Sequence, residues 1–175
     1  PRGAVHIQWQ DYAEKSARHS GYIMAHYEKM ARRLDVKGLQ PEQPTIVIGE
    51  PLKRSKGEAG RVAWQLFFLG FDDVQMASVQ SFQDSLTNTT TKPQDRPSGW
   101  KPRLKESVRV KKDEFLQVVM KPQKYRETHH ILDVRSEREY FSKQGFGQAY
   151  ETPDIQAIHI PWREFFDNKT GRVNT

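Results

Sequence analysis

The stretch GAVHIQWQDY at residues 3–12 returns near the other end of the chain as QAIHIPWREF at residues 156–165. The matched positions keep a constant spacing of 153 residues and include Ala4 with Ala157, His6 with His159, Trp9 with Trp162, and Asp11 with Glu164. A long pattern repeated at one spacing indicates that a whole structural unit is repeated, because each copy then occupies the same place in its own unit. We therefore predict that the chain contains parts of two similar units.

The composition fits a folded protein and excludes some kinds of functional site. Of 175 residues, 35% are hydrophobic and 11% aromatic, which is enough for a core. The formal net charge of +6 permits anionic ligands without identifying one. No apolar run approaches the roughly 18 residues that a membrane span requires. Because the sequence has no cysteine, disulfides, thiolate metal sites and a cysteine nucleophile are excluded in this chain.

Other motifs point to no cofactor, metal or nucleic-acid partner. No nucleotide-binding glycine fingerprint or P-loop is found. His129 and His130 are adjacent on a strand entry and would point to opposite faces, so they make poor joint metal ligands. The basic run at 101–112 lacks interleaved aromatic residues for base stacking, so we interpret it as a solvated surface. The sequence leaves the oligomeric state open. It does not determine the compartment, for which we favour the cytoplasm over the periplasm.

Alternating helix and strand patterns predict an α/β fold with a mainly parallel sheet. Expected helices cover 21–34, 57–70, 111–120 and 136–141, and expected strands cover 4–7, 45–49, 72–78, 130–134 and 157–160. Residues 83–105 are rich in Thr, Asn, Pro, Lys and Gln and show no periodicity. This segment is typical of a surface linker.

Two motif groups carry a resemblance to rhodanese domains. ILDVRSEREY at 131–140, followed by AIHIPWREFF at 157–166, resembles the front of such a domain, and TIVIG at 45–49 with GEAGRVAWQLFFLGFDDVQMAS at 57–78 resembles the back. The resemblance implies a rhodanese-like α/β fold with a mainly parallel sheet flanked by helices and with incomplete domains. It assigns 1–82 to the C-terminal part of a first, noncatalytic domain, 83–105 to a linker, and 106–175 to the N-terminal part of a second domain.

The resemblance also implies a function for the protein of which this chain would be part. Rhodaneses move a sulfane sulfur from a thiosulfate-type donor to a thiophilic acceptor through a cysteine persulfide, held by a loop at a helix N-terminus. Here the corresponding loop is 49–61, and neither Gly49 nor Glu50 can attack where the nucleophile is expected. We therefore expect no catalytic residue in this chain, a cysteine outside it, and a small anionic sulfur compound as the partner. The alternative is a cysteine-free rhodanese-like module used for binding or scaffolding.

Several charged residues are candidates for anion binding or for structural pairing. Lys53, Arg54 and Arg61 could attract an anion in the 49–61 loop, or they could form a solvated basic loop. By the resemblance, Asp133 with Arg135 matches the family's Asp-x-Arg pair, and Glu139 matches a following acid. Arg135 is therefore a candidate for substrate contact. Alternatively, Asp133, Arg135 and Glu139 form an ion-pair network that holds the loop.

The order of the two parts allows two ways of folding. The back of one unit precedes the front of the next, which is also the order of a circular permutant, so strands 45–48 and 130–133 could lie in one sheet. The other arrangement, two incomplete domains with separate clusters, is the one that we favour.

Overall fold

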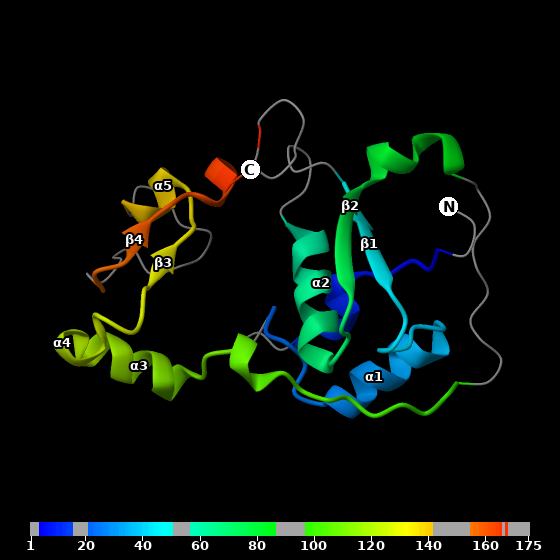
Figure 1. Cartoon of the computed structure of the whole chain (residues 1–175), viewed down its shortest axis with the longest axis horizontal. Helices are drawn as coiled ribbons and strands as arrows, with labels where there is room; N and C mark the ends of the chain where they lie inside the picture. The colour runs from blue at the N-terminus through cyan, green and yellow to red at the C-terminus, as the bar shows by residue number, and fades with distance from the viewer. Residues whose placement is uncertain are drawn as a thin grey trace. The chain divides into compact units, whose positions relative to one another are not determined.

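The computed structural model describes residues 4–15, 21–50, 57–86, 97–141, 155–165 and 167. These residues fall into two compact units, divided between Arg109 and Val110 (Figure 1). Each unit has its own pair of parallel strands, β1 with β2 in the first and β3 with β4 in the second. Among the described residues, strand 45–48 and strand 130–133 therefore lie in different sheets, and the shared sheet of a single permuted domain is not observed.

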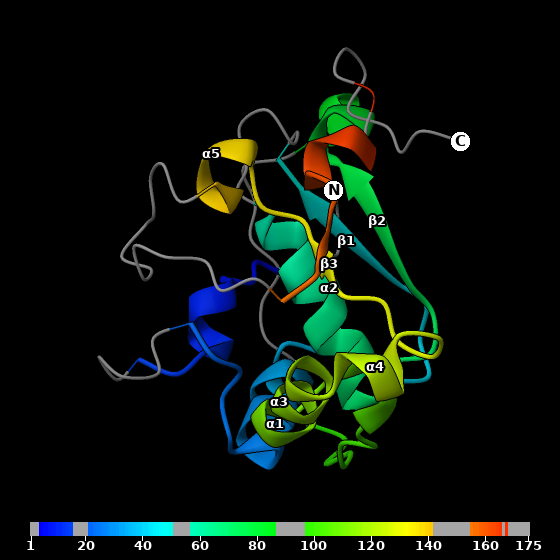
Figure 2. The ribbon, with the colours of Figure 1, turned by 90° about the vertical axis from the view of Figure 1, so that its left-hand side faces the viewer.

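The first unit contains two helices and a parallel strand pair. Its elements are η1 (Trp9–Tyr12), α1 (Tyr27–Val36), β1 (Thr45–Gly49), α2 (Glu58–Leu69), β2 (Val74–Ser78), η2 (Val79–Ser85) and η3 (Glu106–Val108). The register runs from Thr45 opposite Val74 to Gly49 opposite Ser78. Figure 2 shows α2 alongside the two strands that it connects. The buried core consists of Tyr12, Met30, Leu34, Val62, Leu66, Leu69 and Phe71.

Helix α2 ends where the sequence predicts, at a glycine. Gly70 has a φ of 107°, and its N–H donates to the carbonyl groups of Leu66 and Phe67. A side chain is disfavoured at this angle. Space is also lacking, because a Cβ atom on Gly70 would lie 2.7 Å from the carbonyl oxygen of Arg103. Gly70 therefore ends the helix and lets another segment approach its C-terminus closely.

That approaching segment comes from the region expected to be a surface linker. We call residues 97–109 the strap, and they belong to the first unit. Asp35, at 2% exposure, accepts hydrogen bonds from Ser98 N–H at 3.0 Å, Ser98 Oγ at 2.9 Å and Gly99 N–H at 2.7 Å. The Trp100 indole N–H donates to the Leu39 carbonyl at 2.9 Å. Residues 97–105 thus pack on the first unit, which a linker composition did not predict.

The strap also satisfies carbonyl groups at the end of α2. The last carbonyls of a helix have no partner within it. Here the Leu69 carbonyl accepts from Arg103 N–H at 3.0 Å, and the Phe68 carbonyl accepts from Lys105 N–H at 2.9 Å. At the end of the strap, Arg109 donates to the Tyr27 hydroxyl at 2.6 Å. The strap is therefore part of the packing of the first unit.

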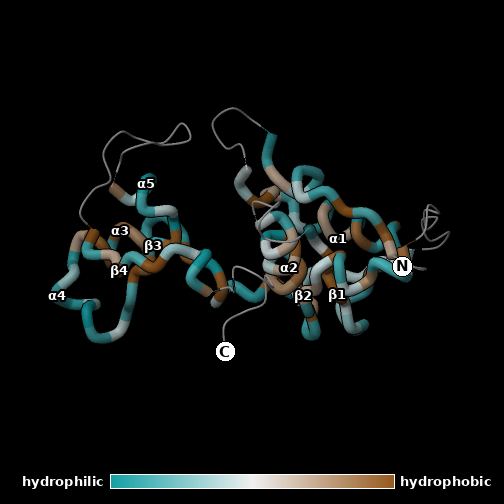
Figure 3. Tube along the Cα trace, turned by 90° about the horizontal axis from the view of Figure 1, so that it is seen from above, coloured by the Kyte–Doolittle hydropathy of each residue, from teal (hydrophilic) through white to brown (hydrophobic). Residues whose placement is uncertain are grey.

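The second unit is smaller and has short elements. These are α3 (Lys112–Met120), α4 (Pro122–Tyr125), β3 (Leu132–Asp133), α5 (Glu137–Tyr140), β4 (Ile158–His159) and η4 (Trp162–Phe165). Leu132 pairs with Ile158 and Asp133 with His159 in a parallel register. Figure 3 shows how apolar and polar residues alternate along both units.

Two predicted elements differ from the structure. Residues 4–7, expected to be a strand, alternate in exposure but form no strand. The helix expected at 21–34 begins only at Tyr27, because Ile23 forms an antiparallel bridge with Ala13 and the Glu14 carboxylate accepts from Ala25 N–H at 2.8 Å. Because of these contacts, backbone groups before Tyr27 bond to residues 13 and 14 and not within a helix.

Two further findings concern the described residues alone. None of their helices has the length and apolar character that crossing a membrane would take. They also contain no group of three or more His, Cys, Asp or Glu side chains arranged to hold a metal ion.

Candidate functional site

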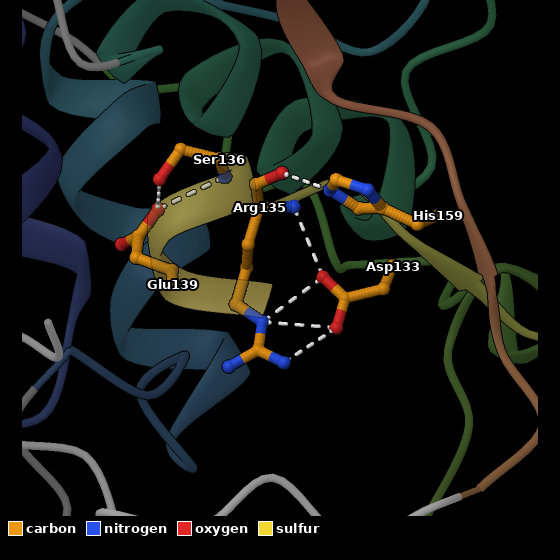
Figure 4. Close-up of polar contacts among 5 residues, drawn as sticks. All are labelled: Asp133, Arg135, Ser136, Glu139 and His159. Carbon is orange, nitrogen blue, oxygen red and sulfur yellow. Dashed lines mark hydrogen bonds and ion pairs between the residues drawn. The ribbon is translucent and has the colours of Figure 1, made fainter. Parts of the chain in front are cut away.

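The end of β3 brings Asp133 and Arg135 into a tight ion pair (Figure 4). Arg135 Nε lies 2.9 Å from Asp133 Oδ1 and 3.0 Å from Oδ2, and a terminal guanidinium nitrogen lies 2.5 Å from Oδ2. The Arg135 backbone N–H also donates to Oδ1 at 3.0 Å. One carboxylate thus fixes both the backbone turn after β3 and the side chain of Arg135.

His159 holds the same turn from β4. The parallel register places it opposite Asp133, and its Nε2 lies 3.0 Å from the Arg135 carbonyl oxygen. Because a carbonyl only accepts, Nε2 carries the proton. The imidazole stacks on the Tyr140 ring at 4.1 Å between centroids with an interplanar angle of 7°. The repeated histidine of the second unit therefore makes structural contacts.

Glu139 closes the first turn of α5. Its Oε2 accepts from the Ser136 hydroxyl at 2.5 Å and from the Ser136 backbone N–H at 3.0 Å (Figure 4). An acid three residues after a serine at a helix start commonly bonds back in this way. Glu139 was predicted to belong to an ion-pair network, and in the structure it accepts hydrogen bonds from Ser136.

All three charged side chains keep their charge over a wide pH range. The hydrogen bond from Arg135 lowers the pKa of Asp133, and the same bond raises the pKa of Arg135. The hydrogen bond from the Ser136 side chain lowers the pKa of Glu139. A group suited to move protons near neutral pH needs a pKa near that pH. The pKa values of Asp133 and Glu139 are instead lowered, away from neutral pH. The arrangement therefore suits holding a backbone turn and an oriented guanidinium.

The other candidate cation with a described position is Arg61, in the first turn of α2. Its guanidinium carbon lies 4.4 Å from the centroid of the Trp9 ring, a cation–π distance. Its buried Nε has no hydrogen-bond partner among the described residues, and burial lowers the pKa of Arg61. Lys53 and Arg54 lie outside the described residues. Arg61 belongs to the first unit and Arg135 to the second.

Sequence reasoning missed the residues that organise these surroundings. Tyr140 was read as part of a motif, but it supports His159 by stacking. Trp9 was singled out only as a repeated residue, and its ring contacts the guanidinium of Arg61. Asp35 was overlooked, although an acid between apolar residues at the end of a helix pattern, in RRLDV, is a signal for a buried acceptor.

Comparison with known proteins gives a match among solved structures. No protein-family model matches the sequence, and no curated protein matches it. Among solved structures, SseA from Escherichia coli, a 3-mercaptopyruvate sulfurtransferase described as having the rhodanese fold, matches with a TM-score of 0.75 and 17% identity. The match covers 99% of this chain and 63% of SseA, so the chain spans less than two-thirds of the length of that protein. The chain therefore has a rhodanese-like α/β fold, built here from parallel strand pairs flanked by helices and incomplete relative to the solved structure.

Proposed function

We propose that this chain is a noncatalytic part of a sulfurtransferase, in which a cysteine outside residues 1–175 carries the sulfane sulfur as a persulfide. The observation that supports this most is the fold likeness to SseA over 99% of the chain, together with a sequence that has no cysteine. Persulfide chemistry requires a thiolate nucleophile. The chain can supply the scaffold and can supply no thiolate.

The candidate site agrees with a supporting role. Arg135 is held by Asp133 through both its side chain and its backbone, and His159 bonds the carbonyl of the same residue. An oriented guanidinium at the C-terminal end of a parallel strand is well placed to meet an anion outside the strand ends. We propose that Arg135 contacts the anionic sulfur compound when the cysteine-bearing part of the protein is present.

The experiment compares residues 1–175 with a longer protein that contains them. Each is incubated with cyanide and either thiosulfate or 3-mercaptopyruvate, and thiocyanate is measured. We expect no thiocyanate above buffer from residues 1–175, and donor-dependent thiocyanate from the longer protein. A longer protein that contains a cysteine and still produces none would refute the sulfurtransferase proposal.

A second candidate function is anion binding without catalysis in the first unit. The unpaired Nε of Arg61, over Trp9, favours it, because a partly dehydrated guanidinium gains from a new acceptor. Lys53 and Arg54 would add positive charge from the same loop. Calorimetric titration with thiosulfate should give heat that Arg61→Gln removes and Arg32→Gln, a change at an exposed residue of α1, leaves unchanged. Equal heats from both variants would reject a site at Arg61.

A further inference from the structure

The strap begins with a contact between a hydroxyl group and a buried carboxylate. Ser98 Oγ lies 2.9 Å from Asp35 Oδ1, and the Ser98 N–H donates to the same oxygen at 3.0 Å. An ionised carboxylate only accepts hydrogen bonds, so the Ser98 hydroxyl directs its proton at Asp35. Among the described residues, the other serine or threonine hydroxyl that donates to a carboxylate is that of Ser136, and its partner Glu139 is only partly buried. Ser98 therefore differs from the other described hydroxyl groups by bonding to a buried acid.

Ser98 is nevertheless accessible, and basic residues follow it in the strap. Ser98 itself is exposed, and so are the side chains of Lys101 and Arg103. Lys101 pairs with Glu28 at 3.8 Å and Arg103 with Asp72 at 3.6 Å, and exposed ion pairs of this kind contribute little to stability. An acidic partner can therefore compete for both cations. Kinases select their substrates partly by such charge patterns.

We propose that Ser98 is a phosphorylation site and that its phosphorylation releases the strap from the first unit. The phosphoryl donor is ATP, and the enzyme is a protein kinase with an acidic substrate cleft. Ser98 Oγ forms a bond to the γ-phosphorus while the bond from that phosphorus to the β,γ-bridging oxygen breaks. The hydroxyl proton passes to a carboxylate of the kinase, and ADP leaves.

A phosphoryl group on Ser98 turns an attraction into a repulsion. The hydroxyl proton that Asp35 accepts is lost, and the phosphate carries a charge of about −1.5 to −2 at neutral pH. Two anions within a few ångströms repel each other strongly where water is scarce, and Asp35 is 2% exposed. The N–H groups of Ser98 and Gly99 then lose Asp35 as their acceptor. The first anchor of the strap is thereby removed.

Loss of this anchor weakens the contacts that follow it along the strap. The Arg103 and Lys105 N–H groups donate to the last carbonyls of α2, and the Trp100 indole donates to the Leu39 carbonyl. These contacts belong to one continuous segment, so we expect them to open together. Phosphorylation of Ser98 therefore converts the strap from a packed segment into an accessible one, and it leaves the C-terminus of α2 open to water.

The release is tested on the whole 175-residue chain with phosphoserine placed at position 98 during translation. The control has phosphoserine in place of Ser107, an exposed residue of the same strap whose hydroxyl donates to no carboxylate among the described residues. Hydrogen exchange at the Arg103 and Lys105 N–H groups, and trypsin cleavage after Arg103, should become faster by about tenfold or more with the phosphate at 98. The control should stay within about twofold of the unmodified chain. Treatment with a phosphatase should restore the slow rates.

A second experiment tests whether Ser98 is modified in the folded chain. The unmodified protein is incubated with ATP and a purified serine kinase that selects basic residues after the serine, and mass spectrometry maps the phosphate. We expect phosphate on Ser98 and none on this segment in Ser98→Ala. Lys101→Gln should slow the modification by about threefold, whereas Arg32→Gln, at an exposed residue of α1, should leave its rate unchanged.

Four results would overturn the proposal. If a peptide of residues 97–107 is phosphorylated and the folded chain is not, Ser98 is inaccessible in the protein. Exchange that stays slow with phosphate at 98 would show that the strap tolerates it. Equal acceleration by phosphate at 98 and at 107 would make added charge the cause, without a part for Asp35. Fast exchange that the phosphatase does not reverse would show damage to the fold and no switch.

Discussion

Replacing Asp35 with alanine should destabilise the first unit, because this carboxylate holds the start of the strap. Asp35 is 2% exposed and accepts three hydrogen bonds from Ser98 and Gly99. A hydrogen bond to a charged group contributes about 1.5–3 kcal/mol. Ser98 and Gly99 are themselves exposed, so water can replace part of what they lose. We therefore expect a loss of about 2–4 kcal/mol in the free energy of unfolding rather than the full sum.

Urea denaturation followed by tryptophan fluorescence measures this loss, because Trp100 lies in the strap and packs edge-on against Phe71 at 5.5 Å between ring centroids. Ser98→Ala should cost about 1 kcal/mol, since it removes only the hydroxyl donor. Asp84→Ala, at an exposed residue of η2, is the matched control and should stay within about 0.5 kcal/mol. An Asp35→Ala protein as stable as the control would refute the structural role of the strap.

Three further predictions follow from single contacts. Gly70→Ala should destabilise the first unit by about 2–4 kcal/mol in urea denaturation, because it combines a φ of 107° with a Cβ placed 2.7 Å from the Arg103 carbonyl; a neutral effect would contradict the packing of the strap on α2. The lowered pKa of Asp133 means that its stabilisation is present above the unfolded pKa of about 3.9 and is lost as the pH falls through the folded value. Asp133→Asn should therefore cost about 1–3 kcal/mol at pH 7 and much less near pH 2, and a cost independent of pH would exclude the ion pair as its cause. Ser136→Ala should weaken the start of α5 by about 1 kcal/mol and raise the pKa of Glu139 in an NMR titration, whereas an unchanged pKa would show that the serine hydroxyl is not its main partner.

The sequence predicted elements whose signals are local. TIVIG predicted β1 because a compact apolar run after a proline is typical of a strand in a parallel sheet, and Gly70 marked the end of α2. The repeat indicated that the segments at 3–12 and 156–165 occupy equivalent positions in two similar units. The resemblance matched Asp133 and Arg135 to the family's Asp-x-Arg pair, and in the structure their side chains form an ion pair.

Features that depend on distant partners were not predictable in the same way. Residues 4–7 have the composition of a strand, but the strand pairings among the described residues do not include them. The strap has a linker composition, yet Asp35 and the C-terminus of α2 supply partners for its backbone. Such long-range pairing depends on which groups a fold leaves unsatisfied, and a local pattern does not contain that information.

The most direct test of the proposed function maps persulfide by mass spectrometry. A longer protein that contains residues 1–175 is treated with thiosulfate or 3-mercaptopyruvate, digested after alkylation, and compared with the 175-residue chain treated in the same way. We predict one donor-dependent persulfide, on a cysteine outside residues 1–175, that disappears on addition of cyanide as thiocyanate forms. Thiocyanate formation by purified residues 1–175 alone, or a longer protein whose cysteines never carry the added sulfur, would contradict the account.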